Sequence, residues 1–220
     1  MNKSRITIYA EVAAIFLIMI LLSETIKLHS VYMVFVPYTI TVGLIFAYTF
    51  FRKRNAASLG ITRKNIFWQI IIGVILFVIT ATFTIILPLR TGSMSVSYLL
   101  DFYAKKTPTL VMLTVNCFIF SGFGEEIIFR GFIMGRLLEL RECGSGRIET
   151  AALSVGLSAA LFGIAHYPSN GDKSQLLIAI GIGILYGIVR LLIKQGSTLA
   201  TGLAHGLHDT CFVFLANFHI

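Results

Sequence analysis

The stretch Gly124-Glu125-Glu126-Ile127-Ile128-Phe129-Arg130-Gly131 places two adjacent carboxylates and an arginine inside a segment that is otherwise apolar enough to enter a bilayer. On insertion scales, each charge near the middle of a membrane helix costs roughly 2.5–3.5 kcal/mol. Three such residues would oppose insertion by about 8–10 kcal/mol if they faced lipid. They are therefore expected to face protein or a wet cavity, and a functional site becomes the default interpretation.

The whole chain has the composition of a polytopic membrane protein. Of its 220 residues 56% are hydrophobic and only 13% are charged, and the mean hydropathy is +0.86. We predict an all-α fold: one membrane-embedded helix-bundle domain over residues 1–220, with a motif-bearing core at about 109–218. About seven apolar segments have membrane-crossing length: Ile6 to Leu22, Val31 to Phe51, Ile66 to Leu89, Thr109 to Leu138, Ala151 to Ala165, Leu176 to Ile193 and Leu199 to Phe218.

The net charge of +8 comes from basic residues that lie between the apolar segments and not along one face of a soluble helix. No nucleic-acid partner is therefore expected. Most of the 18 Lys and Arg residues fall on the same side of the predicted topology as the N-terminus. The positive-inside rule then predicts a multi-pass protein of the cell membrane with a cytoplasmic N-terminus and an external C-terminus. The three cysteines are odd in number and support neither a disulfide framework nor a paired-cysteine zinc site.

Helical spacing assigns different roles to the two adjacent glutamates. Glu126 and Arg130 are four residues apart and share a face in the favoured acid-before-base order, so we predict a buried ion pair. Glu125 points about 100° away and lacks the arginine, which makes it the better general base and Glu126 the better structural partner. The alternative is that all three residues form an ionic cluster that only locks helices together.

Two later segments add histidines. The segment Phe162–His166 closes an apolar span with a histidine, although a single histidine there equally suits the helix dipole or the interface. The segment His205–Asp209 places a histidine and a carboxylate four residues apart on one face, with His208 close enough to complicate the assignment. The alternative for this second set is that its side chains only form polar contacts that hold helices together.

Several protease mechanisms are excluded by inspection. The chain contains no His-Glu-x-x-His zinc helix and no G-x-S-x-G nucleophile elbow, and Ser121 lacks an obvious serine-protease context. The remaining carboxylates and histidines lie on three separate predicted helices. Such a set can activate water directly or hold a metal that does so.

Glycines in the sixth apolar segment do not form a dinucleotide-binding loop. The pair Gly183-x-x-x-Gly187 lies within an apolar run and lacks the G-x-G-x-x-G pattern. We interpret it as a ridge of small residues that lets two membrane helices approach closely.

Three motifs in order, Glu-Glu-x-x-x-Arg, Phe-x-x-x-His and His-x-x-x-Asp, resemble the CPBP family of intramembrane proteases. This family includes the CAAX prenyl-protein endopeptidases and bacterial bacteriocin-processing and self-immunity proteins. The resemblance implies that Glu125 and His166 activate the attacking water, and that His205 and Asp209 stabilise the oxyanion. Glu126 and Arg130 would support the site.

The partner of the last motif histidine is often Asn in this family, whereas this chain has Asp209. An ionised Asp209 would repel an oxyanion, so it must be protonated, orient His205 or bind a metal. Older family descriptions suppose a metalloprotease, and the ligand set here would be His166, His205 and Asp209, with zinc as the metal. We favour the glutamate-type mechanism, which needs no metal, and expect no cofactor.

The leading hypothesis is an intramembrane endopeptidase that hydrolyses membrane-associated peptides or proteins with water activated by Glu/His. Its partners would be membrane lipid and a peptide substrate such as a leader peptide, a pheromone or a prenylated C-terminus. A non-catalytic membrane scaffold or peptide-binding immunity factor could use the same polar cluster. A transporter is disfavoured because the charges gather in three late helices without an inverted repeat.

The segment boundaries conflict with this hypothesis at one point. Glu125 lies midway along the fourth apolar segment, whereas His166 falls at the outer end of the fifth. The two side chains can meet only if the fifth helix is tilted or displaced, or if its boundaries differ from those drawn.

Overall fold

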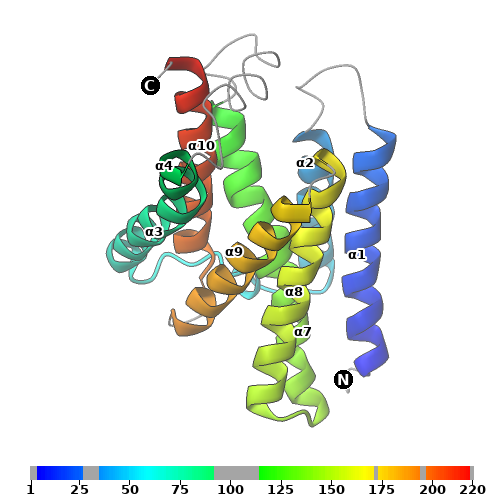
Figure 1. The fold of residues 1–220 in the computed structure, drawn as a ribbon. Coiled ribbons are helices and arrows are strands. Elements are labelled where there is room, and N and C mark those ends of the chain that lie inside the picture. The colour runs from blue at the N-terminus through cyan, green and yellow to red at the C-terminus, as the bar shows by residue number, and fades with distance from the viewer. Residues whose placement is uncertain (1–3, 27–34, 92–113, 171–172, 194–196, 219–220) are drawn as a thin grey trace.

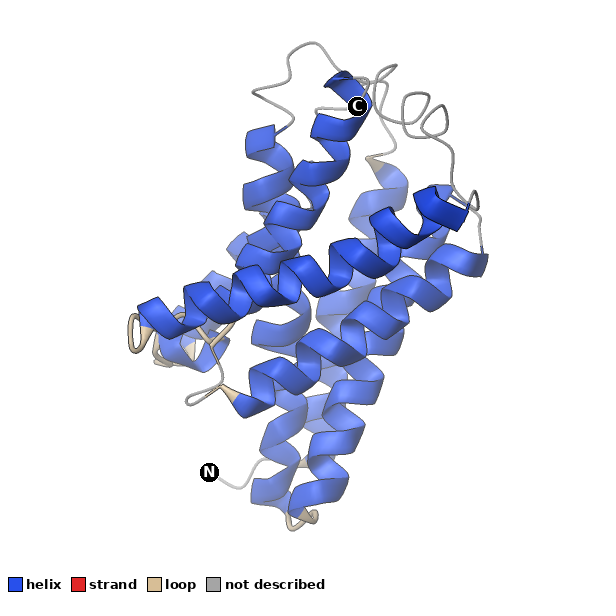
Figure 2. Cartoon of the chain, turned by 60° about the vertical axis from the view of Figure 1, so that its left-hand side comes forward, coloured by secondary structure: helices blue, strands red, loops and turns tan. Residues whose placement is uncertain are grey.

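The computed structural model of the protein describes residues 4–26, 35–91, 114–170, 173–193 and 197–218. Throughout these ranges every regular element is a helix, so the all-α prediction is confirmed (Figure 2). The helices form one bundle whose N- and C-termini lie at opposite ends (Figure 1). In chain order the elements are α1 (Arg5–Thr25), α2 (Val36–Phe51), η2 (Ala56–Leu59), α3 (Ile66–Ala81), η3 (Thr82–Ile86), α4 (Leu87–Thr91), η5 (Cys117–Gly124), η6 (Ile127–Met134), α7 (Gly135–Leu138), η7 (Glu139–Cys143), α8 (Arg147–Asn170), α9 (Lys173–Leu192) and α10 (Leu199–Phe218).

The bundle is a membrane protein by helix length and apolar surface. Four helical stretches are long and apolar enough to cross a bilayer, and α2, with 16 residues, is shorter. Large apolar side chains such as Phe50 and Trp68 point outward with 77% and 63% exposure, as a lipid-facing surface requires. Each of the seven predicted apolar segments coincides with a helix, although residues 31–34 and 109–113 lie outside the described part. Beyond the four long stretches, the number of crossings stays a prediction.

The four stretches are Arg5–Thr25, Ile66–Thr91, Arg147–Tyr167 and Gln175–Leu192.

The helix that carries the glutamate pair is not a regular α-helix. Residues 114–138 are helical throughout, but η5 and η6 are π-helical, and only a short α-helical turn at Glu125 and Glu126 joins them. Turns of π-helix widen the helix and occur frequently at functional sites. The sequence spacing, which we interpreted at 100° per residue, did not anticipate this widening.

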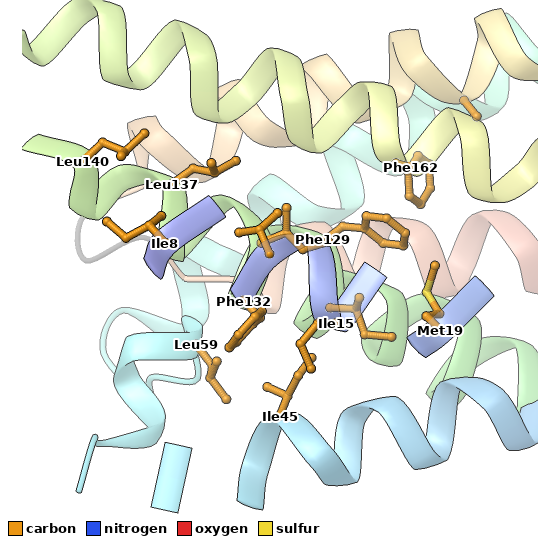
Figure 3. Packing of buried hydrophobic residues seen from close by; sticks show 14 residues of the cluster. Ile8, Ile15, Met19, Ile45, Leu59, Phe129, Phe132, Leu137, Leu140 and Phe162 are labelled. Atoms are coloured by element: carbon orange, nitrogen blue, oxygen red, sulfur yellow. The ribbon is translucent and has the colours of Figure 1, made fainter. Parts of the chain in front are cut away.

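A hydrophobic core on one side of this helix holds it in place (Figure 3). The core joins α1, α2, η6 and α8, and the rings of Phe129 and Phe162 meet edge to face with their centroids 5.1 Å apart. The van der Waals contacts of these closely packed side chains fix the rotation of the helix about its axis. Members that Figure 3 labels include Ile8, Ile15, Met19, Ile45, Phe129, Phe132 and Phe162.

Small residues allow the closest helix contacts. A Cβ added to Gly183 of α9 would lie 2.9 Å from Cα of Ala159 on α8, which confirms the interpretation of Gly183 as a packing residue. On the other side of the bundle, a Cβ on Gly122 would lie 2.6 Å from Cα of Gly206. Only glycine at both positions lets η5 and α10 touch backbone to backbone, and α10 carries His205, His208 and Asp209, which are described below.

The structure corrects the boundaries of the fifth apolar segment. The predicted segment covered 151–165, whereas α8 runs from Arg147 to Asn170 and the preceding helix continues through η7 to Cys143. The turn between them contains Gly144 at a φ of 84°. Glu125 lies 19 residues before Gly144 and His166 lies 22 residues after it, so the antiparallel pair brings them to similar heights. The apparent conflict came from ending the helices too early.

Candidate active site

Glu125 lies at the centre of the polar cluster. The residue is only 3% exposed, and its Oε2 atom is 3.6 Å from Nε2 of His166 and 3.9 Å from Nε2 of His205. These distances exceed those of direct hydrogen bonds, and within the described part of the chain Oε2 accepts none. A water molecule at ordinary hydrogen-bond lengths of about 2.8 Å can contact the carboxylate and an imidazole together at such a separation.

His166 has one ring nitrogen fixed by its own helix. Nδ1 lies 2.8 Å from the carbonyl oxygen of Phe162, which can only accept, so Nδ1 carries the proton. In the neutral ring, Nε2 then carries a lone pair that faces the carboxylate of Glu125. The side chain is 32% exposed and so can be reached from outside the core. The four-residue spacing of Phe-x-x-x-His therefore sets the tautomer of the histidine.

The predicted ion pair between Glu126 and Arg130 is confirmed. Nη1 of Arg130 donates to Oε1 of Glu126 over 2.8 Å, and both side chains are fully buried. The guanidinium also lies over the rings of Phe162 and Tyr186, with its carbon 4.2 and 5.5 Å from the two ring centroids. The Phe of the second motif is thus part of the packing around Arg130.

His205 lies between carboxylates on both sides of its ring. Nδ1 is 3.3 Å from Oε1 of Glu126, whereas Nε2 is 3.6 Å from Oδ2 of Asp209 and faces Glu125. Since each ring nitrogen faces an acceptor, both can carry a proton. His205 is then able to offer the N–H at Nε2 to an oxygen that develops negative charge.

Each oxygen of the Asp209 carboxylate has its own partner. The hydroxyl of Ser121 on η5 donates to Oδ2, and Nδ1 of His208 lies 3.1 Å from Oδ1. Ser121 received no role from the sequence. It reaches Asp209, 88 residues away, because Gly122 and Gly206 let η5 and α10 touch.

Two residues from the N-terminal half also reach the cluster. The Tyr38 hydroxyl of α2 lies near the Glu125 carboxylate. Thr84, in the π-helical segment η3, contacts Nε2 of His208 over 2.7 Å. Both lie in apolar segments without any motif, so the sequence carried no signal for either.

The positions of these side chains bear on the ligand set that a metal would need. Among the residues that the structure describes, no three His, Cys, Asp or Glu side chains are gathered as a metal-ligand group. His166 and His205 face Glu125, and Asp209 is engaged by Ser121 and His208. As placed, His166, His205 and Asp209 do not form that site.

A second group of ionised side chains occupies the far end of the same helix, and we name it the anchoring cluster. Arg54 binds both oxygens of Glu139 at 2.6 and 2.8 Å, and the hydrogen bonds to Glu139 raise the pKa of Arg54. Arg136 donates to Glu139 over 2.5 Å and also to Glu11 of α1. The cluster comprises Glu11, Tyr48, Arg52, Arg54, Arg136 and Glu139.

Comparison with known proteins agrees with the motifs. The family model for the type II CAAX prenyl endopeptidase Rce1-like proteins matches residues 106–211. No curated protein and no solved structure matches the chain significantly. The matched range contains every motif residue from Glu125 to Asp209 and excludes α1, α2 and α3. The resemblance to CAAX-type intramembrane proteases is confirmed: over residues 106–211 this membrane helix bundle is similar to the Rce1-like type II CAAX prenyl endopeptidases.

Proposed function

We propose that the protein is an intramembrane endopeptidase that hydrolyses peptide bonds with a water molecule activated by Glu125 and His166. The convergence of Oε2 of Glu125 with Nε2 of both His166 and His205 carries this proposal. The three atoms come from three helices and leave one carboxylate oxygen free to accept a proton. Acyl transfer to water needs such a base beside a donor for the oxyanion.

The geometry supports a direct attack without an acyl-enzyme. Glu125 accepts a proton from the water while the water oxygen bonds to the peptide carbonyl carbon, with the lone pair of His166 orienting the water. The carbonyl oxygen becomes an oxyanion, to which His205 donates from Nε2. As the C–N bond breaks, Glu125 returns the proton to the leaving amine. Products are a carboxylic acid and an amine, and the enzyme is unchanged.

For Asp209, we propose the role of orienting His205, one of the roles left open above. Both of its oxygens face donors, Ser121 on one side and His208 on the other. A carboxylate accepts hydrogen bonds from both partners at once, whereas a protonated acid would require the Ser121 hydroxyl to turn and accept. An oriented His205 then presents Nε2 toward the site.

We further propose that the reaction needs no metal. Exhaustive chelation in detergent should leave peptide cleavage unchanged, and the purified protein should carry much less than one equivalent of zinc. Stoichiometric zinc whose removal and return switch the activity off and on would overturn the glutamate-type mechanism.

The test of function uses the full chain in proteoliposomes with membrane-anchored peptides in H₂¹⁸O. We expect wild-type protein to release a new C-terminal carboxylate with one ¹⁸O, and no hydroxamate to form when hydroxylamine is added. Glu125→Gln should lower this release about 10³-fold at equal protein level. If the biological function survives in Glu125→Gln, the protein acts as a scaffold or peptide-binding immunity factor instead.

For the substrate, we propose a membrane-associated peptide presented from the bilayer. Paired peptides with and without a C-terminal prenyl group, together with leader-like hydrophobic peptides, distinguish the candidates by kcat/KM.

The N-terminus is proposed to be cytoplasmic. Arg5 at the start of α1 donates to the backbone carbonyl of Cys143 at the end of η7, so these two basic regions lie at the same end of the bundle (Figure 1). Basic residues gathered on one side support the cytoplasmic placement of that end. Reporters fused to each terminus should place the N-terminus inside and the C-terminus outside.

A further inference from the structure

His208 is adjacent to the family motif, not part of it, yet both of its ring nitrogens are engaged. Nδ1 lies 3.1 Å from Oδ1 of Asp209, and Nε2 lies 2.7 Å from Oγ1 of Thr84. The side chain is 11% exposed. Its ring therefore spans the distance from α10 to η3 with a polar partner at each end.

The hydrogen-bond roles along this connection follow from the donor inventory. A carboxylate oxygen only accepts, so Nδ1 of His208 donates to Asp209. At the other nitrogen, the Thr84 hydroxyl either donates its single proton or accepts one while it donates to the Thr80 carbonyl, 2.8 Å away. In both cases Thr84 holds the plane of the imidazole.

The two oxygens of Asp209 are thereby held by donors from two other directions. Ser121 donates to Oδ2 and His208 to Oδ1, so both side-chain torsions of Asp209 are constrained. Oδ2 then lies 3.6 Å from Nε2 of His205. An asparagine would offer one acceptor oxygen and no negative charge, and the Ser121 hydroxyl would have to turn and accept from its NH₂ group. The aspartate at this position is thus matched to its surroundings.

We propose that His208, held by Thr84, is a positioning residue that orients the Asp209 carboxylate and through it aims Nε2 of His205 at the reacting carbonyl. This inference rests on the proposed function and adds residues of η3 and α10 to the site. His208 and Thr84 act through Asp209 and do not touch the substrate.

The test compares His208→Leu, which removes both contacts, with His208→Asn, whose amide N–H occupies the place of Nδ1–H. We expect His208→Leu to lower kcat on the order of 10-fold with KM unchanged, as for removal of other groups that orient a ligating or catalytic histidine. His208→Asn should restore most of the loss. Thr210→Val on the same helical turn is the matched control, because its hydroxyl has no hydrogen-bond partner in the described part of the chain.

A double-mutant cycle separates positioning from a general structural effect. In an Asp209→Ala background, His208→Leu should have no further effect on kcat, because there is no carboxylate left to orient. An equal loss in both backgrounds, or full activity of His208→Leu, overturns the proposal.

A readout independent of catalysis distinguishes failure of this inference from failure of the proposed function. In protein labelled with ¹⁵N-histidine, the ring signals of His205 should shift in His208→Leu and stay unchanged in Thr210→Val. An unchanged His205 spectrum in His208→Leu overturns the positioning role. Absence of hydrolysis by wild-type protein, with the expected spectral shift present, contradicts the protease function alone.

Discussion

The helix over residues 114–143 contributes side chains to two groups of ionised residues, and the two groups are built differently. In the anchoring cluster, both oxygens of Glu11 and both of Glu139 accept hydrogen bonds from Arg or Tyr side chains. In the polar cluster around Glu125, the nearest histidine nitrogens lie 3.6 and 3.9 Å from Oε2, too far for direct hydrogen bonds.

This difference separates a group that stabilises from a group that reacts. A carboxylate whose two oxygens both accept hydrogen bonds from cationic side chains holds helices together, and those partners make it less ready to accept a proton. A carboxylate oxygen near two imidazoles but bonded to neither can accept one from a water molecule. The comparison predicts that substitutions in the two clusters affect different measurements.

The largest expected effect follows the substitution Glu125→Gln. An amide keeps the shape but cannot accept the proton of water, so kcat should fall about 10³-fold while the melting temperature stays within error. Cleavage assays and thermal unfolding of the same preparation measure both. If the variant unfolds instead of losing activity, Glu125 belongs with the stabilising group.

Glu126→Gln should act on stability, because it leaves Arg130 charged in a buried site. Breaking a buried pair in this way destabilises by about 3–5 kcal/mol, so the yield of folded protein should fall well below that of Glu125→Gln. Equal yields for the two variants, with activity lost only in Glu126→Gln, would reverse the roles assigned to the two glutamates.

Asp209→Asn has a smaller expected effect that sharpens the comparison within the polar cluster. The amide removes the negative charge beside Nε2 of His205 and requires the Ser121 hydroxyl to turn and accept from the NH₂ group, which leaves His205 less well oriented. We expect kcat to fall on the order of 10-fold or more at every pH. Retained activity that extends to higher pH would instead support a protonated Asp209 that donates to the oxyanion.

The smallest effect is expected for Glu139→Gln in the anchoring cluster. Arg54 and Arg136 each lose a charged partner at a site that is partly open to solvent, where side-chain exposure of Glu139 is 16%. The free energy of unfolding should fall by about 1–2 kcal/mol, with kcat per folded molecule unchanged. A specific loss of kcat would show that the anchoring cluster also takes part in catalysis.

Most helices, the membrane character and the ion pair of Glu126 with Arg130 could be predicted from sequence. The reason is that apolar runs and four-residue spacings are local properties. The position of His166 relative to Glu125 was harder to predict from sequence, because it depends on where two helices end. Polar residues beyond the apolar runs, through Cys143 and from Arg147, extend these helices because the hairpin packs them together.

Sequence alone determined which residue types were available for chemistry and that Glu125, His166, His205 and Asp209 lay in an apolar, helical chain. Tertiary structure alone decided which side chains surround them. Ser121, Tyr38 and Thr84 show no periodicity or motif, and they reach the cluster only through packing, as at Gly122 and Gly206. Such contacts depend on the close approach of distant helices, which residue spacing along one helix does not encode.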